Sequence, residues 1–85
     1  IGLRDVEQRI ANYLIAEVEK NNIKSRNNEY VINLPVTKSV LSSMLGTTKE
    51  TLSRKLSLLQ DEGLILMEGQ RKIIITDIES LRDIQ

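Results

Sequence analysis

The sequence predicts a mainly α-helical domain with a small antiparallel sheet. Two observations favour this class. Apolar residues recur every three to four positions near the start and in the middle of the chain, which is the period of an amphipathic helix. Shorter runs rich in β-branched residues follow both regions, bounded by Asn, Pro or Gly. A length of 85 residues allows one core and not two, so residues 1 to 85 are expected to form a single domain.

The first helix is expected over residues 5 to 20. Asp5 and Gln8 have the spacing of a capping box at its start. Asn21 and Asn22 end the helix, because Asn tolerates left-handed backbone, and a polar loop follows. The apolar face consists of Leu3, Val6, Ile10, Leu14 and Val18.

A short strand is expected in the stretch YVINLP. Tyr30, Ile32 and Leu34 fall on one face at the two-residue period of a strand. Pro35 stops the pattern, and because proline cannot donate a ladder hydrogen bond, the strand is placed at a sheet edge.

Two helices joined by a very tight turn are expected next. Thr37 is placed to cap the first, and Gly46 ends it, since glycine adopts a positive φ at the lowest cost. Thr47 or Thr48 then caps a helix over residues 49 to 61. The first apolar face comprises Val40, Leu41, Met44 and Leu45, with Val36 stapled onto Leu41, and the second comprises Leu52, Leu56 and Leu59, with Gly63 closing the helix.

A hairpin and a short helix complete the chain. Leu64 to Met67 and Lys72 to Thr76 are β-rich runs on either side of Gly69. Asp77 caps a last helix that carries Ile78, Leu81 and Ile84. This order of elements is typical of a winged helix-turn-helix, in which the second helix of the tight pair enters the DNA major groove and the hairpin is the wing.

The distribution of charge favours the same function. The net charge is zero, but residues 22 to 55 carry six basic and two acidic groups, and both flanks are acidic. A local basic region of this kind supplies a phosphate-facing field, with chance clustering as the alternative.

Helix 49 to 61 carries the candidate base-reading residues on the face opposite its leucines. Arg54 offers a fork for guanine, Glu50 an acceptor for cytosine N4, and Ser53 suits several base edges. Lys49 fits either bases or phosphates. The alternatives are an ordinary surface ion pair between Glu50 and Arg54, one turn apart, or a capping box between Glu50 and Thr47.

Contacts to the DNA backbone are expected from helix starts and from basic side chains, because hydroxyls, free amides and cations all suit phosphate oxygens. The alternatives are simple capping for the threonines and solvated charge for the cations. The candidates are Thr37, Lys38, Ser39, Thr47, Thr48, Thr51, Lys55, Ser57, Arg71 and Lys72.

Several other function classes are not expected. Without Cys or His the usual zinc and copper ligands and the commonest general base are absent, so neither an enzyme nor a metal or cofactor site is expected. RNA binding usually needs an aromatic stacking platform, and Tyr13 and Tyr30 both fit packing positions. No apolar run approaches the roughly 18 residues that span a bilayer, and there is no signal peptide, so a cytoplasmic protein without membrane contact is expected.

Three stretches resemble the DNA-binding domain of the Crp/Fnr family of bacterial transcription regulators: DVEQRIANYLI, LPVTKSVLSSMLGTTKETLSRKLSLLQDEGLI and IIITDIESL. The most specific signal is LG followed by ETLSR and a Leu-rich stretch to GLI. The resemblance implies that Glu50 and Arg54 are base readers and that Ser53 matches the Fnr-like subset. Lys49 stands where the cyclic AMP receptor protein has an Arg that reads a guanine, so a TTGA-type half-site is implied.

The resemblance also implies partners outside this chain. Family members are typically homodimers with a sensory β-barrel and a dimerisation helix, which would lie before Ile1, and the effector of that region is unknown. The chain alone is therefore expected to be a monomer that binds one half-site weakly. The loop after the first helix is implied as a contact for RNA polymerase, with a solvated loop as the alternative; it comprises Lys24, Ser25, Arg26, Asn27 and Asn28.

Two further alternatives remain open. Lys55 stands where many relatives have an apolar residue, so it either snorkels out of the core or reaches a phosphate. The rival function is a winged helix used only for protein association, whose affinity would lack a steep salt dependence.

Overall fold

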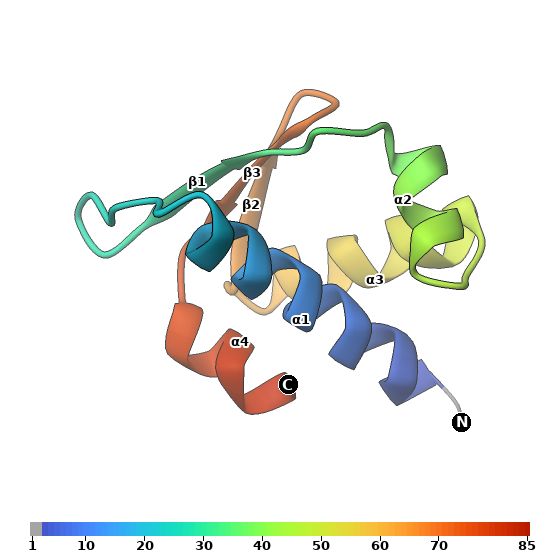
Figure 1. Ribbon diagram of the computed structural model, residues 1–85. Coiled ribbons are helices and arrows are strands. Elements are labelled where there is room, and N and C mark those ends of the chain that lie inside the picture. The colour runs from blue at the N-terminus through green and yellow to red at the C-terminus, as the bar shows by residue number, and fades with distance from the viewer. Residues whose placement is uncertain (1–2) are drawn as a thin grey trace.

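The structure, a computed structural model, describes residues 3 to 85, with side chains from Val6 onward. Over this range the chain forms four helices and a three-stranded antiparallel sheet in the predicted order (Figure 1). The predicted winged helix-turn-helix fold is confirmed. The elements are α1 (Leu3–Lys20), β1 (Tyr30–Asn33), α2 (Lys38–Met44), α3 (Lys49–Asp61), β2 (Ile65–Glu68), β3 (Lys72–Ile75) and α4 (Ile78–Ile84).

The start of α1 differs from the prediction. The helix includes Leu3 and Arg4, so Asp5 lies inside it and the expected capping box with Gln8 is wrong. A capping residue must lie outside the hydrogen-bonded turns, and the helical period alone does not say where the first turn begins. The other end is as predicted, because Asn22 takes a left-handed φ of 51° and the Ile23 amide donates to the Val18 carbonyl at 3.0 Å.

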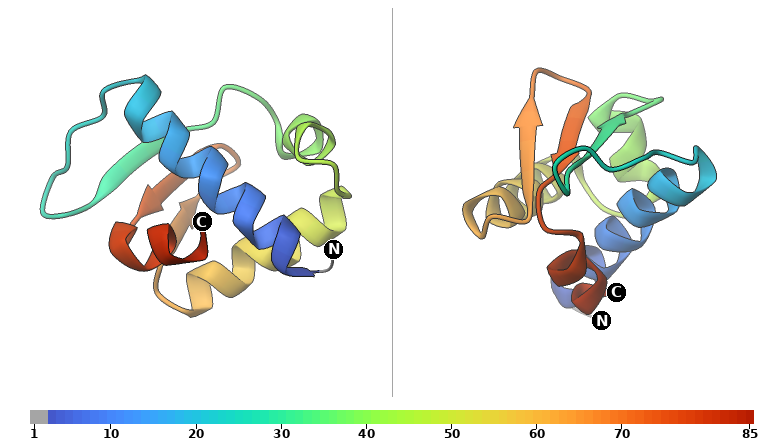
Figure 2. Two further views of the ribbon diagram at one scale, coloured as in Figure 1. Left: turned by 60° about the horizontal axis from the view of Figure 1, so that its bottom comes forward. Right: turned by 90° about the vertical axis from the view of Figure 1, so that its left-hand side faces the viewer.

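The sheet has the order β1-β3-β2, so β1 is an edge strand as predicted. Ile73 of β3 lies opposite Ile32 of β1 and opposite Met67 of β2. The hairpin turn contains Gly69 at a φ of 66°, and the hairpin projects beyond the helices as a wing (Figure 1; Figure 2, right).

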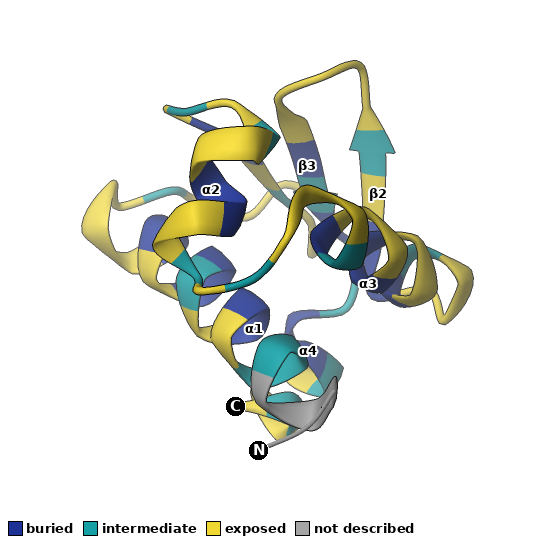
Figure 3. Cartoon of the chain, turned by 90° about the vertical axis from the view of Figure 1, so that its right-hand side faces the viewer, coloured by how far each residue is buried: buried dark blue, intermediate teal, exposed yellow. Residues whose placement is uncertain are grey.

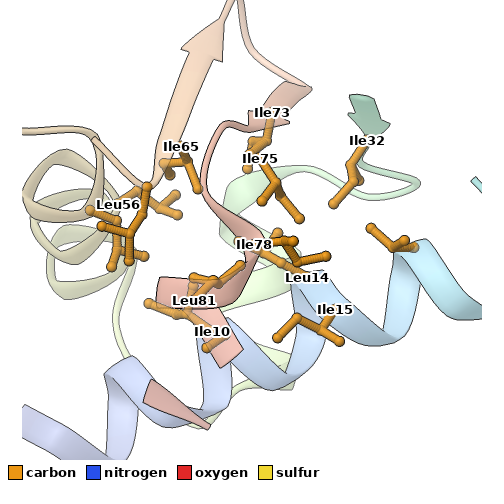
Figure 4. Packing of buried hydrophobic residues seen from close by; sticks show 14 of the residues in the cluster. Ile10, Leu14, Ile15, Ile32, Leu56, Ile65, Ile73, Ile75, Ile78 and Leu81 are labelled. Carbon is orange, nitrogen blue, oxygen red and sulfur yellow. The ribbon is translucent and has the colours of Figure 1, made fainter. Parts of the chain in front are cut away.

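One apolar core joins the sheet to α1, α3 and α4. Side chains from all four parts meet at its centre, as Figure 4 shows for Leu14, Leu56, Ile75 and Leu81. Each of these is at most 1% exposed, and burying one such side chain stabilises the fold by about 1.5 to 3 kcal/mol. The core therefore fixes the position of α3 against the sheet and α1.

The apolar face predicted for α2 is only half correct. Leu41 is buried and Leu45 is half-buried, but Val40 and Met44 are 49% and 58% exposed. Val40 precedes Leu41, and Met44 precedes Leu45, so each points about 100° away from the residue that faces the core. A helix of seven residues packs only one narrow face against the core, and these two side chains lie outside that face. Val36, predicted to staple onto Leu41, packs against the core.

The last helix begins as predicted. Asp77 accepts hydrogen bonds from the amide and the hydroxyl of Ser80, at 3.1 and 2.7 Å. These two bonds hold the pKa of the Asp77 carboxyl below its usual value, because they favour the charged form. No helix in residues 3 to 85 is long and apolar enough to cross a membrane.

Candidate nucleic-acid interface

The turn between α2 and α3 is closed by backbone bonds. Gly46 takes a φ of 71°, its amide donates to the Ser43 carbonyl at 3.1 Å, and the amide of Thr47 donates to the Ser42 carbonyl at 2.9 Å. Positive φ disfavours side chains with a Cβ, which explains the glycine. The two helices are therefore held at a fixed corner.

Thr48, and not Thr47, caps α3. Its hydroxyl oxygen accepts from the Thr51 amide at 3.1 Å, and the two threonine hydroxyls lie 3.0 Å apart. With Thr48 as the cap, Glu50 is the second residue of the helix and not the third. The alternative of a capping box between Thr47 and Glu50 is therefore wrong, and the Glu50 carboxylate is left for other partners.

The outward face of α3 has the predicted composition. Figure 3 shows α3 with one side turned to the core and the other to solvent. Leu52, Leu56 and Leu59 are at most 1% exposed. The side chains of Lys49, Glu50, Ser53, Arg54 and Ser57 are all exposed.

Glu50 and Arg54 form the surface ion pair that was one reading of their spacing. Arg54 Nη2 lies 3.5 Å from Glu50 Oε2, with side chains 76% and 83% exposed. A pair this exposed contributes only about 0.3 to 0.5 kcal/mol. The pair is therefore weak enough to open, which lets Arg54 turn toward another acceptor.

A hollow of about 360 Å³ lies beside the start of α3 and joins three elements. Lys38, Lys49 and Arg71 bring positive charge to it from α2, α3 and the wing. Among the side chains described, from residue 6 onward, no carboxylate lies within ion-pair distance of these three cations. Thr37, Ser39 and Gln70 complete its lining. Five of these residues were predicted from the sequence as DNA contacts. Gln70, which lies in the hairpin turn next to Gly69, was not.

Two cations predicted to contact phosphate have protein partners. Lys55 Nζ lies 3.1 Å from Glu7 Oε1, and its side chain is 8% exposed. It points into the molecule and not toward the outward face, so a phosphate contact is not supported for it. Lys72 Nζ lies 3.3 Å from Glu68 Oε1 across the wing, and it keeps 44% of its side chain exposed.

The loop predicted to meet RNA polymerase is an exposed turn at the opposite end of the molecule from α2 (Figure 1; Figure 2, left). Arg26 and Glu29 exchange backbone hydrogen bonds of 2.9 and 3.0 Å. Asn27 and Asn28 between them have φ values of 55° and 65°. Its side chains are therefore available without any change at α3.

These features define the class of the protein. It is a winged helix-turn-helix domain in which α3, the second helix of the tight pair, presents polar residues beside a basic hollow. Residues 8–84 match the family of Crp-like helix-turn-helix domains, and the chain belongs to that family.

Curated relatives are transcription regulators. The transcriptional activator protein FnrL of Cereibacter sphaeroides is 31% identical over 84 residues, which are 95% of this chain and 34% of that protein. A probable transcriptional activator of Rhizobium leguminosarum is 32% identical over 84 residues, covering 95% and 33%. The chain thus spans about a third of the length of these relatives.

Solved structures agree. FixK2 from Bradyrhizobium japonicum matches with a TM-score of 0.79 and 25% identity, over 94% of this chain and 38% of that one. The CO-dependent transcription factor CooA from Carboxydothermus hydrogenoformans matches in fold, with a TM-score of 0.81 and 22% identity, over 92% and 35%. The chain is a DNA-binding output domain of the Crp/Fnr type, and the reading as an association module is not favoured.

Proposed function

We propose that α3 reads base edges in the major groove with Lys49, Glu50, Ser53 and Arg54. The observation that carries this proposal is the exposed row of these side chains opposite the buried leucines. Opening the weak pair between Glu50 and Arg54 costs little, whereas a bidentate contact from Arg54 to guanine gives about 1 to 3 kcal/mol of discrimination. As the family resemblance implies, a TTGA-type half-site is the proposed target.

Contacts to the DNA backbone would hold the start of α3 in the groove. The basic hollow supports this, because cations from α2, from α3 and from the wing gather in it beside the start of the recognition helix. Hydroxyls at the helix starts add neutral donors. The proposed backbone contacts are Thr37, Lys38, Ser39, Thr47, Thr48, Thr51, Ser57, Gln70, Arg71 and Lys72.

Fluorescence-anisotropy titration of duplexes with and without a TTGA half-site, at two salt concentrations, tests base reading. We expect Arg54→Ala to abolish the preference for the half-site. The matched control is Arg82→Ala, which removes the same charge from the exposed side of α4. If Arg54→Ala keeps the same preference for the half-site as the control, base reading by Arg54 is wrong.

For the whole protein we propose a cytoplasmic homodimer, and for this chain alone a monomer that binds one half-site weakly. A single small module makes few phosphate and base contacts, which supports weak binding. Light scattering that showed a stable dimer of this chain would contradict the second part.

The turn at residues 24 to 28 is proposed as the contact for RNA polymerase. Its exposure and its distance from α3 support a partner that binds at the same time as DNA. Substituting Arg26 and Asn27 in the whole regulator should keep DNA binding and lower activation in a transcription assay. Unchanged activation would leave this turn as an ordinary solvated loop.

A further inference from the structure

Two side chains from the first turns of α1 hold the helix-turn-helix. Glu7 Oε1 lies 3.1 Å from Lys55 Nζ in the middle of α3. Arg9 Nη1 donates to the carbonyl of Leu45 at 3.1 Å, at the end of α2. These contacts join residues 48 and 36 positions apart in the chain, so nothing local in the sequence requires them.

The pair between Glu7 and Lys55 differs in kind from the pair on the outward face. The Lys55 side chain is 8% exposed and that of Glu7 is 32% exposed, whereas Arg54 and Glu50 are mostly in water. A largely buried ammonium needs a charged partner, because desolvating it alone is costly. Lys55 therefore depends on Glu7 far more than Arg54 depends on Glu50.

The position of Lys55 along α3 makes this pair matter for DNA. Lys55 follows Arg54 directly, and adjacent residues on a helix are about 100° apart. The buried leucines hold α3 in place, and Lys55 fits this arrangement only while its charge has a partner on α1. Without Glu7 the ammonium would be drawn toward water, and α3 would rotate about its own axis to let it out. That rotation decides where Ser53 and Arg54 point.

We propose that Glu7 is a positioning residue for DNA reading, which acts through Lys55 to set the rotation of the recognition helix. This inference rests on the base reading proposed for α3. Arg9 supports the same arrangement by holding the end of α2. The turn between α2 and α3 and the recognition helix itself are thus both attached to α1.

The test compares Glu7→Gln with the control Glu19→Gln, which removes a carboxylate that is 66% exposed and lies 3.9 Å from Arg82 Nη1. Circular dichroism and urea unfolding first show that each variant is folded. We expect Glu7→Gln to weaken binding to the half-site duplex by about fivefold, with binding to an unrelated duplex unchanged. The control is expected to bind both duplexes like the original chain.

A second-site variant separates positioning from a direct role of Glu7. Lys55→Met fills the same space without a charge, so it removes the need for a partner. Glu7→Gln combined with Lys55→Met should return to within about twofold of the original half-site affinity. If Glu7→Gln does not fold, Glu7→Asp takes its place, because it withdraws the carboxylate by one methylene. Its half-site affinity is then compared with that of Glu19→Gln and with that of the double variant Glu7→Asp and Lys55→Met.

Three results would overturn the proposal. Glu7→Gln binding like Glu19→Gln would mean that the rotation of α3 does not depend on the pair. A double variant no better than the single would mean that Glu7 does not act through Lys55. The third result is a weaker salt dependence of Lys55→Met on both duplexes. If the slope of log K against log salt fell by about one, the amount expected for one lost phosphate contact, Lys55 would lie on the DNA. If Arg54→Ala also proves silent, base reading itself is wrong; if Arg54→Ala alone has an effect, base reading stands and only the positioning role falls.

Discussion

The tight turn between α2 and α3 gives a prediction whose size follows from geometry. Gly46→Ala places a Cβ on a residue with a φ of 71°. The nearest group to that Cβ would be Arg9 Nη1 at 3.6 Å, which is an ordinary contact, so no neighbour has to move. Only the left-handed backbone is penalised, and we expect a loss of about 1 to 2 kcal/mol in the free energy of unfolding.

Gly63→Ala is the matched control for this prediction. Gly63 follows α3 with a φ of 81°, and no atom lies within 4 Å of the Cβ it would gain. The two variants should therefore lose the same stability. In a domain of this size each lost kcal/mol lowers Tm by roughly 4 to 8 °C, which thermal unfolding followed by circular dichroism resolves.

The outcome that would refute this reasoning is a clear difference between the two glycines. A much larger loss for Gly46→Ala would mean that the new Cβ displaces Arg9 and breaks its hydrogen bond to Leu45. A loss near zero would mean that the turn adopts another conformation and that the positive φ is not required.

Three further predictions follow from single contacts. Leu56→Ala should cost about 2 to 5 kcal/mol in urea unfolding, because Leu56 is 1% exposed at the centre of the core; a loss under 1 kcal/mol would contradict this packing. Thr48→Ala should cost about 1 kcal/mol, and Thr47→Ala less than half as much, since only Thr48 accepts from the Thr51 amide; equal losses would contradict the assignment of the cap. Because the pKa of Asp77 is lowered in the fold, its contribution to stability is present above the usual Asp value of about 3.9 and is lost as the pH falls through the lower folded pKa. Asp77→Asn should therefore lose less stability on acidification than the original chain. Identical acid-unfolding profiles for the two would contradict this role of Asp77.

The secondary structure was largely predictable because its signals are local. The Thr37 and Asp77 caps, and the positive φ at Gly46, depend on residues within four positions of each other. The bounds of α3 agree with the prediction for the same reason. The start of α1 was mispredicted because a capping-box pattern occurs by chance inside a longer helix.

The candidate site was predictable in part. Helical geometry alone separates Arg54 from Leu52 and Leu56, so the outward face of α3 follows from the spacing of residues. The hollow does not, because it needs α2, α3 and the wing to meet. Gln70 was missed since nothing in the sequence says that the turn of the wing approaches the start of α2.

The sequence by itself determined the order of elements, the corner between α2 and α3, and which side of α3 faces solvent, because these depend on dihedral preferences and on the helical period. Only the tertiary structure decided that Lys55 turns inward to Glu7, that Arg9 holds the Leu45 carbonyl, and that Val40 and Met44 stay exposed. Those outcomes depend on which surfaces meet when α1 packs on the helix-turn-helix. A lysine in a helical pattern is compatible with solvent, phosphate or a buried carboxylate until the residue opposite it is known.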